Sequence, residues 1–350
     1  MIEHSMPTIA KEEIEAVIRV MKSRYLAEGE VVTRFEDELS SYIGSKGGVA
    51  TSTGTLALHL ALVSLGIGEN DEVIIPNYVC RSVLNSVLYS GAKPVLSDIN
   101  ENDYNISFES AKNKISRKTK AVIIPHMFGY PAEIDKFKNL GIYIIEDCAH
   151  SVGAEYKGRR TGNWGDLSIF SFEGTKYMIT GEGGMVLANS VSLLNSLRKL
   201  KKPDSADGRI KYTYRMTNLQ AAIGRVQLSK LTWFIKRRRQ IAKAYDNAFC
   251  HFDVDFPAMN PDRLSVFHRY MLNIKRDITS IISRCYKKGV KVKQPVKPFL
   301  LNRYLGLSGT NYPNSRRILK SAVSIPIYPS LTDKELKLII NVVSSELKKL

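Results

Sequence analysis

The chain has 350 residues, 44% of them hydrophobic, which is enough for a large buried core and indicates one large domain with a smaller one. Its first residues show no basic segment followed by an apolar run, no stretch is long and apolar enough to span a bilayer, and its four cysteines lack disulfide or zinc spacing. We therefore expect a protein that is not exported and that works in a reduced, cytoplasmic compartment. The formal net charge of +17 would suit nucleic acid, an anionic membrane surface or a phosphate-bearing small substrate, but the basic residues are spread along the chain.

Two helices are predicted at the start of the chain. Over residues 11–26 the pattern predicts an amphipathic helix. Its apolar side chains follow helical spacing, and its charged ones are expected elsewhere on the surface; they are Ile14, Val17, Ile18 and Met21, and Glu12, Glu13 and Arg19. A second helix is predicted over about residues 31–43.

From about residue 47 onward, short apolar runs alternate with helical segments. The predicted strands are 48–50, 73–76, 94–96, 121–125 and 142–145, and the helices between them are 54–66, 79–90 and 107–116. This alternation predicts an α/β fold with a mostly parallel sheet covered on both faces. In such sheets ligands bind beyond the carboxyl ends of the strands.

Polar residues directly after these strands are therefore the candidate site residues. The segment Thr51–Thr55 precedes a helix, so it is either an anion site at the helix N-terminus or an ordinary cap. Asp147 follows the strand 142–145 and is either the partner of a protonated ring nitrogen or a helix cap. His150 either donates to a ligand oxygen or fills the pocket wall. No Walker loop or dinucleotide fingerprint is present, so nucleotide hydrolysis and hydride transfer gain no support.

A single lysine stands on the connection between two apolar runs, Leu167–Phe172 and Met185–Ala188. Glycines at positions 181, 183 and 184 follow it, and a turn rich in glycine can fold tightly against a ligand. Because an unprotonated lysine amine attacks carbonyl carbons, Lys176 is a candidate for covalent chemistry. The alternative is an ordinary solvated lysine.

The remainder of the chain is predicted to be helical at first and then mixed. A helix over 190–202 and a polar loop over 203–211 precede a long helix over 217–248, whose basic run 236–239 is expected to be a solvated face. Beyond about residue 255 the pattern predicts a small α+β domain. Its predicted elements are strands 268–274 and 290–292 and helices 278–288 and 332–348.

Taken together, these segments resemble the DegT-type sugar aminotransferase family of fold-type I pyridoxal-phosphate (PLP) enzymes, over nearly the whole chain. The matching segments are Gly29–Glu36, Ser52–Leu58, Asp71–Pro76, Gly91–Val95, Glu146–His150, Gly153–Gly158, Gly165–Asp166, Ser171–Gly184, Tyr214–Thr217, Gln220–Gly224 and Ile325–Thr332. The resemblance implies a mostly parallel, seven-stranded aminotransferase sheet with a smaller C-terminal α+β domain. It places the N-terminal segment and the large PLP-binding domain in residues 1–250 and the small domain in 251–350, and it implies a homodimer.

The resemblance also assigns roles to the candidate residues. Lys176 matches the lysine that binds the cofactor covalently and then shuttles the proton, and Asp147 matches the aspartate that faces the pyridine nitrogen. His150 matches the residue beside the 3′-oxygen of the ring. The phosphate-binding positions are Thr53, Gly54, Thr55 and Ser171.

Three positions depart from the family pattern. Cys80 stands where relatives present an aromatic ring that stacks on the cofactor, so stacking falls to Tyr78 or to a shifted loop. Thr213 replaces an asparagine that reaches the phosphate of the neighbouring subunit's cofactor, with Arg215 as a substitute. The segment 291–298 replaces a His-Tyr-Pro segment that helps to shape the sugar site.

The expected function is amination of a keto sugar carried on a nucleotide diphosphate, with glutamate as the amino donor. An aminotransferase for a cyclitol or another keto compound stays open because of segment 291–298. A sugar dehydratase on the same scaffold would have histidine in place of Lys176. A nucleic-acid-binding protein would show stacking aromatics on a basic face or a recognition helix, and neither pattern is present.

Overall fold

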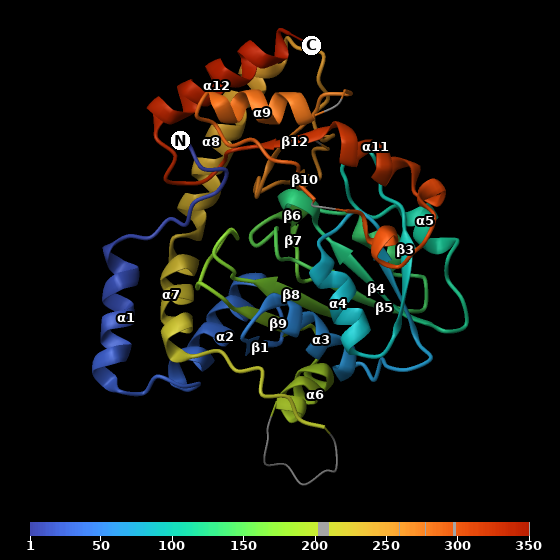
Figure 1. Cartoon of the computed structure of the whole chain (residues 1–350). Coiled ribbons are helices and arrows are strands. Elements are labelled where there is room, and N and C mark those ends of the chain that lie inside the picture. The colour runs from blue at the N-terminus through green and yellow to red at the C-terminus, as the bar shows by residue number, and fades with distance from the viewer. Residues whose placement is uncertain (202–209, 259, 277, 297–298, 350) are drawn as a thin grey trace.

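A seven-stranded sheet forms the centre of the computed structural model, which describes residues 1–201, 210–258, 260–276, 278–296 and 299–349 (Figure 1). Its strands are β1 (Gly47–Thr51), β2 (Glu72–Pro76), β3 (Lys93–Ser97), β4 (Thr119–Pro125), β5 (Tyr143–Asp147), β8 (Leu167–Ser171) and β9 (Gly184–Ala188). The strand order is β1-β9-β8-β5-β4-β2-β3. Strand β9 is antiparallel to both of its neighbours and the other pairs are parallel, which confirms the predicted sheet.

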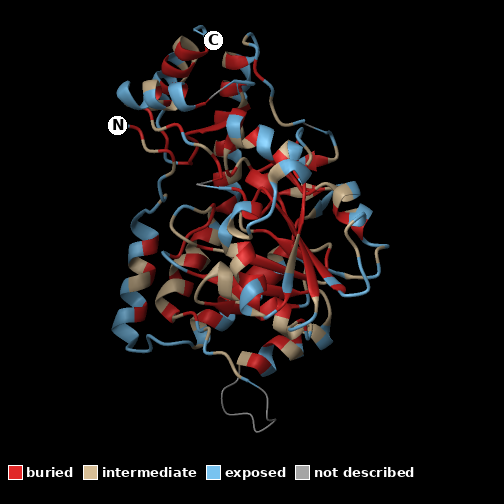
Figure 2. Cartoon of the chain, turned by 45° about the vertical axis from the view of Figure 1, so that its right-hand side comes forward, coloured by how far each residue is buried: buried red, intermediate tan, exposed pale blue. Residues whose placement is uncertain are grey.

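Helices cover both faces of this sheet because its strands are apolar on both sides. On one face lie α3 (Gly54–Ser64), α4 (Arg81–Tyr89) and α6 (Val191–Lys201), packed on alternate strand residues such as Val49 and Ile145. The other face carries α2 (Glu30–Ile43) and α5 (Phe108–Lys112). Figure 2 shows the strands buried between helices whose outer surfaces are exposed.

The elements after residue 217 divide between a second, smaller core and the packing of the large domain. They are α7 (Asn218–Ser229), α8 (Leu231–Phe249), β10 (Arg263–Leu264), β11 (Tyr270–Asn273), α9 (Thr279–Lys287), α10 (Leu301–Tyr304), α11 (Pro313–Ser321), β12 (Ala322–Ile325) and α12 (Asp333–Leu347). Antiparallel β11 and β12 pack against α8, α9 and α12, while β10 extends a small sheet with β6 (Glu155–Tyr156) and β7 (Arg159–Arg160). Neither this packing nor the sheets test the predicted boundary at residue 250, which stays a prediction. None of the helices in the described part of the chain has the length and apolar character that a membrane crossing requires.

Two of the predicted elements after residue 217 are wrong in detail. The long helix is broken at Lys230, where ψ is −4° instead of the helical value near −42°. The predicted strand 290–292 is absent, and only single bridges join Val290 to Ile2 and Lys293 to Ser324. Most of the predicted polar loop, residues 202–209, lies outside the described residues.

The predicted helix at the start of the chain is present as α1 (Lys11–Ser23), but its predicted faces are wrong: Ile14 and Met21 are 56% and 54% exposed, and Glu13, expected on the surface, is buried. Helix α1 instead packs on α7 through Ala16 and Val20. Its buried Glu13 is neutralised by Lys230, with 2.8 Å between Nζ and Oε2.

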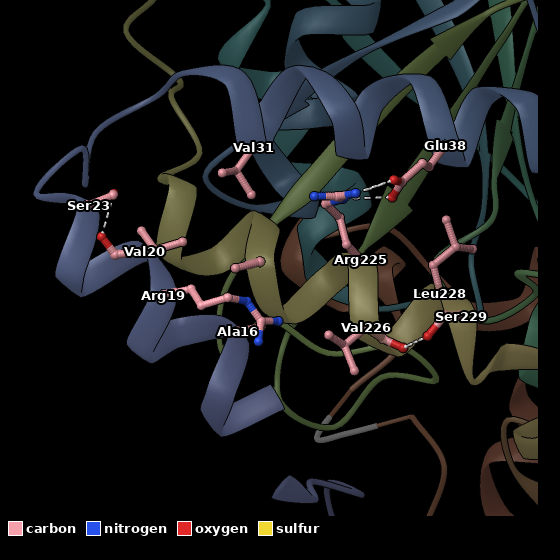
Figure 3. A pocket seen from close by; sticks show the side chains of 11 residues that line it. Ala16, Arg19, Val20, Ser23, Val31, Glu38, Arg225, Val226, Leu228 and Ser229 are labelled. Atoms are coloured by element: carbon pink, nitrogen blue, oxygen red, sulfur yellow. Dashed lines mark hydrogen bonds and ion pairs between the residues drawn. The ribbon is translucent and has the colours of Figure 1, made fainter. Parts of the chain in front are cut away.

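A surface groove of about 600 Å³ lies between α1, α2 and α7 (Figure 3). Two arginines line it, Arg19 and Arg225, and Arg225 is already paired in bidentate fashion with Glu38. The groove contains none of the residues that the sequence predicts for chemistry.

Candidate active site

The carboxyl ends of β1, β5 and β8 lie at one edge of the sheet and bring most of the predicted site residues into one pocket of about 390 Å³. The pocket is lined by Thr53, Gly54, Thr55, Leu58, Cys80, Ser82, Val83, Asp147, Ala149, Ile169, Ser171, Glu173, Lys176 and Glu182. His150 contacts the pocket through Lys176. Thr213 is exposed and does not line this pocket.

One end of the pocket is the N-terminus of α3. The Thr53 hydroxyl accepts a hydrogen bond from the Leu56 amide at 3.2 Å and caps the helix. Glycine is required at position 54, since a Cβ there would lie 2.7 Å from Cβ of Ser171. A Cβ on Gly184 would lie 2.4 Å from the Thr53 carbonyl oxygen. The two glycines therefore let the end of β8 and the turn into β9 press against the start of α3, which forms a narrow cradle for an anion.

Asp147 forms the floor of the pocket at the end of β5. Its side chain is 6% exposed, and one carboxylate oxygen accepts a hydrogen bond from the Ala149 amide at 3.0 Å. Burial raises the pKa of Asp147, although the Ala149 amide and Lys176 act in the opposite direction. A carboxylate in this position favours a cationic partner, because the partner would offset the cost of burying its charge.

Lys176 extends into the pocket from the turn that follows β8. Its backbone amide donates to the Glu173 carbonyl at 2.8 Å, and its Nζ lies 3.3 Å from Nε2 of His150. Desolvation, Lys176 and Arg269 together hold the pKa of His150 well below its usual range. The imidazole is therefore neutral near pH 7 and offers the pocket a neutral hydrogen-bonding group.

Comparison with known proteins identifies the chain. The model of the DegT/DnrJ/EryC1/StrS aminotransferase family matches residues 7–344. The chain belongs to this family. This DegT-family chain is 32% identical to the spore coat polysaccharide biosynthesis protein SpsC of Bacillus subtilis, over 99% of the chain and 97% of SpsC. It is also 32% identical to GDP-perosamine synthase of Vibrio cholerae, over 91% of each chain.

The fold is shared with Spr1654 of Streptococcus pneumoniae in its PLP form, at a TM-score of 0.94 and 25% identity over 99% of each chain. The DegT-family protein is thus a PLP-dependent aminotransferase. Its own pocket fits this cofactor: the glycine cradle would hold the phosphate, Asp147 would meet the pyridine nitrogen, and Lys176 would reach the aldehyde carbon.

Two histidines beside this pocket, His150 and the buried His268, predict a dependence of stability on pH. His268 stacks on His150, with 4.1 Å between ring centroids, and desolvation also holds the pKa of His268 well below its usual range. The unfolded chain therefore binds protons on these residues that the folded protein does not. Stability is full above the unfolded pKa of about 6.5 and is lost as the pH falls below it, at up to about 1.4 kcal/mol per unit for each imidazole.

Urea unfolding of the cofactor-free DegT-family protein at pH 7.5 and pH 5.5 measures this effect. We expect the loss of unfolding free energy at the lower pH to shrink by about 1 kcal/mol in His268→Phe, because that variant no longer has a proton to gain at this site. If His268→Phe loses as much unfolding free energy between pH 7.5 and pH 5.5 as the wild type does, His268 is charged in the folded protein at the lower pH and the prediction is wrong.

Two groups of residues at the site were missed from the sequence. Glu173 and Glu182 line the pocket but are ordinary loop residues by pattern. Arg238 was predicted to be part of a solvated helix face and is instead 3% exposed, which corrects that prediction for one residue of the run. Burial lowers the pKa of its guanidinium to about 10, so the group is still charged at pH 7. His268 and Arg238 are distant from His150 in the sequence and share no motif with it, so their proximity could not be predicted from the sequence.

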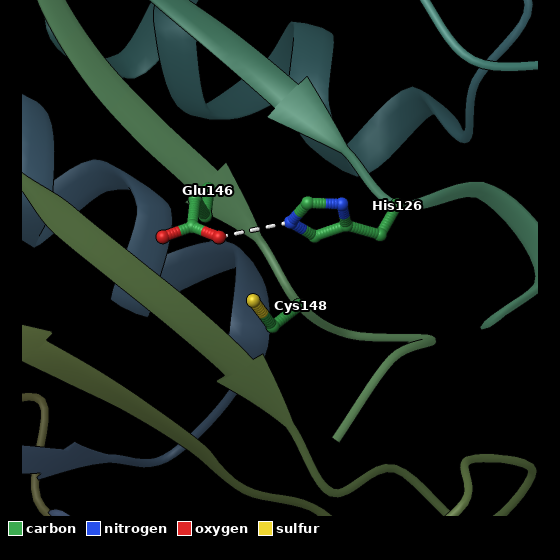
Figure 4. A group of neighbouring side chains, drawn as sticks. All are labelled: His126, Glu146 and Cys148. Atoms are coloured by element: carbon green, nitrogen blue, oxygen red, sulfur yellow. Dashed lines mark hydrogen bonds and ion pairs between the residues drawn. The ribbon is translucent and has the colours of Figure 1, made fainter. Parts of the chain in front are cut away.

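A cluster of potential metal ligands, His126, Glu146 and Cys148, lies directly beside Asp147 (Figure 4). The atoms of His126 and Glu146 that could bind a metal already take part in hydrogen bonds. The Glu146 carboxylate accepts hydrogen bonds from His126 Nε2 and from the amides of residues 162, 164 and 165, and His126 Nδ1 accepts from the Ala132 amide. Burial raises the pKa of the Cys148 thiol well above its usual value. We interpret the cluster as a structural brace for the end of β5.

Proposed function

We propose that the protein transfers an amino group to a keto sugar carried on a nucleotide diphosphate, with glutamate as the amino donor. The observation that carries this proposal is the single pocket in which Lys176, Asp147 and the cradle at the start of α3 meet. The chain's similarity to GDP-perosamine synthase supports a nucleotide-linked substrate. The net charge of +17 agrees with a doubly phosphorylated substrate, because a cationic potential raises its encounter rate.

The proposed roles follow from position and chemistry. When bound, PLP supplies an electron sink that stabilises negative charge on the carbon that loses or gains a proton. Lys176 holds the cofactor covalently at rest and carries the proton during transfer. Asp147 keeps the pyridine nitrogen protonated, because its buried charge is stabilised by a cation at this point. His150, neutral and 3.3 Å from Lys176 Nζ, orients that amine and would offer a hydrogen bond to the oxygen of the cofactor ring.

The phosphate of the cofactor is proposed to lie on the cradle. Thr53, Gly54 and Thr55 would bind it through the start of α3, and Ser171 would donate its hydroxyl from the end of β8. Cys80 lies on the pocket wall at the start of α4, so it is proposed to contact the cofactor ring with its sulfur. Tyr78 is fully buried and does not line the pocket, which disfavours it as the stacking ring.

We also propose that the protein acts as a homodimer in the cytoplasm. Thr213 is exposed and lies outside the pocket of its own chain, as expected of a residue that contacts the phosphate in a partner's site. The exposed apolar side chains of α1 are of the kind that subunit interfaces bury. Light scattering on the purified protein should give twice the mass of the chain, and the mass of one chain would contradict the proposal.

The substrate is tested by glutamate-dependent amination of nucleotide-linked 3-keto and 4-keto sugars, with release of 2-oxoglutarate as the readout. We expect at least one of these sugars to be aminated and the corresponding free keto sugar to react far more slowly, because it lacks the diphosphate. If the protein aminates a cyclitol ketone but none of the nucleotide-linked keto sugars, the proposed substrate is wrong. It would leave the aminotransferase assignment intact.

A further inference from the structure

The ring of His150 stacks with two aromatic rings. The centroid of His268 lies 4.1 Å away with an interplanar angle of 13°, and that of Phe128 lies 6.2 Å away with an angle of 15°. The same ring places its Nε2 3.3 Å from Nζ of Lys176. The direction in which His150 meets the lysine is therefore set by the rings that stack on it.

His268 is in turn fixed through its backbone. Nη1 of Arg238 donates to the carbonyl of His268 at 3.1 Å and to that of Phe267 at 3.0 Å. Phe267 has a φ of +50°, a left-handed conformation that a bulky side chain rarely adopts without support from its surroundings. The buried Arg238 supplies that support, because it stabilises both carbonyls of the strained segment.

The same guanidinium also contacts the lysine turn. Its central carbon lies 4.6 Å from the ring centroid of Tyr177, the residue next to Lys176. A third carbonyl, that of Ile327, accepts from Nη1 at 2.8 Å and ties the group to the segment before α12. Arg238 extends from α8, which continues from α7 toward α12 (Figure 1) and contributes its first residues to the core beside α2 and its last residues to the smaller core. Arg238 thus contacts the backbone of His268, which stacks on His150, and the ring of Tyr177, which follows Lys176 in the chain.

We infer that Arg238 and His268 are positioning residues that hold the His150 imidazole and the Lys176 amine at their working distance. This inference rests on the proposed function only in that Lys176 and His150 are taken as the reacting pair. Arg238 acts through Phe267 and His268 on one side and through Tyr177 on the other. Neither residue lines the pocket. Displacements of about 1 Å at such contacts cost about a hundredfold in rate.

The test compares Arg238→Met with Arg239→Met. Arg239 is the matched control, since it follows Arg238 on α8 and donates through Nε to the nearby Ser265 carbonyl at 3.0 Å, but it contacts neither the rings nor Tyr177. In a single turnover with glutamate alone, we expect Arg238→Met to convert bound PLP to its amino form about 10- to 100-fold more slowly, at an unchanged glutamate half-saturation. Arg238→Lys should recover part of the rate, and Arg239→Met should match the wild type.

A second readout needs no cofactor. NMR of the cofactor-free protein with isotope-labelled histidine, assigned with His150→Gln, should show one neutral tautomer of His150 from pH 5.5 to 8. In Arg238→Met the His150 signals should broaden and begin to titrate, whereas in Arg239→Met they should stay as in the wild type. Lys176 and Arg269 lower the pKa of the His150 ring, and neither is changed. Arg238 itself lowers the pKa of His268, so Arg238→Lys, which keeps the positive charge, controls for the charge that Arg238→Met removes.

Each outcome decides the inference. If Arg238→Met lowers the melting temperature but keeps the wild-type His150 signals and half-reaction rate, Arg238 is only structural and the inference is wrong. Where Arg238→Met does not fold, His268→Phe, which keeps the stacked ring, should stay within about threefold of the wild-type rate and His268→Leu should not. Equal rates in the two would overturn the role of His268. If Lys176 does not bind PLP in the wild type, the proposed function fails while the NMR result still decides the inference.

Discussion

Lys176→Ala is expected to lower the rate of amino transfer by at least about 10⁴-fold, because the variant loses both the covalent link to the cofactor and the proton carrier. The pocket otherwise keeps its shape, since the Lys176 side chain is only half-buried and interacts through its amine with His150 and with the charge of Asp147. PLP should therefore still bind, held by the cradle and Asp147, but without the visible absorption band of covalently bound cofactor.

The control for this prediction is Lys93→Ala. Lys93 is a largely exposed lysine on β3 that pairs with Glu72. Its removal should leave the absorption band and the rate unchanged. Wild-type absorption and turnover in Lys176→Ala would show that another amine forms the covalent link.

Asp147→Asn is expected to lower the rate by about 10³-fold while PLP stays bound through Lys176, since the variant removes the buried charge that keeps the pyridine nitrogen protonated. Single-turnover kinetics with glutamate measure this loss. Asp166→Asn is the matched control, because Asp166 is a carboxylate just before β8 that accepts from the Ile144 amide and does not line the pocket. That variant should lose no more than a few-fold.

The same substitution should have the opposite effect on stability. Because burial raises the pKa of Asp147, its carboxylate destabilises the cofactor-free fold above the unfolded pKa, and this cost disappears as the pH falls below the usual pKa of an aspartate. Cofactor-free Asp147→Asn should thus melt at a higher temperature than the wild type at pH 7 and at a similar one near pH 3. A lower melting temperature at pH 7 would mean that the carboxylate is stabilised by contacts other than those to Ala149 and Lys176.

The sheet and most of the pocket could be predicted from the sequence because both are encoded locally. Continuous apolar runs give parallel strands, and parallel strands place the residues that follow them at one edge. Thr53, Asp147 and Lys176 each follow such a run or precede a helix, so their meeting in one pocket required only the sheet order.

The missed features depend on partners that are distant in sequence. Helix α1 buries Glu13 instead of Ile14 because Lys230, from the other half of the chain, neutralises the carboxylate. Arg238 is buried because carbonyl groups of three residues, two of them in a segment with positive φ, converge on it. Helical periodicity reports only which residues share a face and cannot indicate such acceptors.

The most direct test of the central claim is to reduce the PLP-loaded protein with borohydride and map the modified peptide by mass spectrometry. Reduction fixes the cofactor to the amine that holds it. The account predicts a pyridoxyl group on the peptide that contains Lys176, with little label on any other lysine. Label on a different lysine, or none after loading, would contradict the assignment of this pocket as the active site.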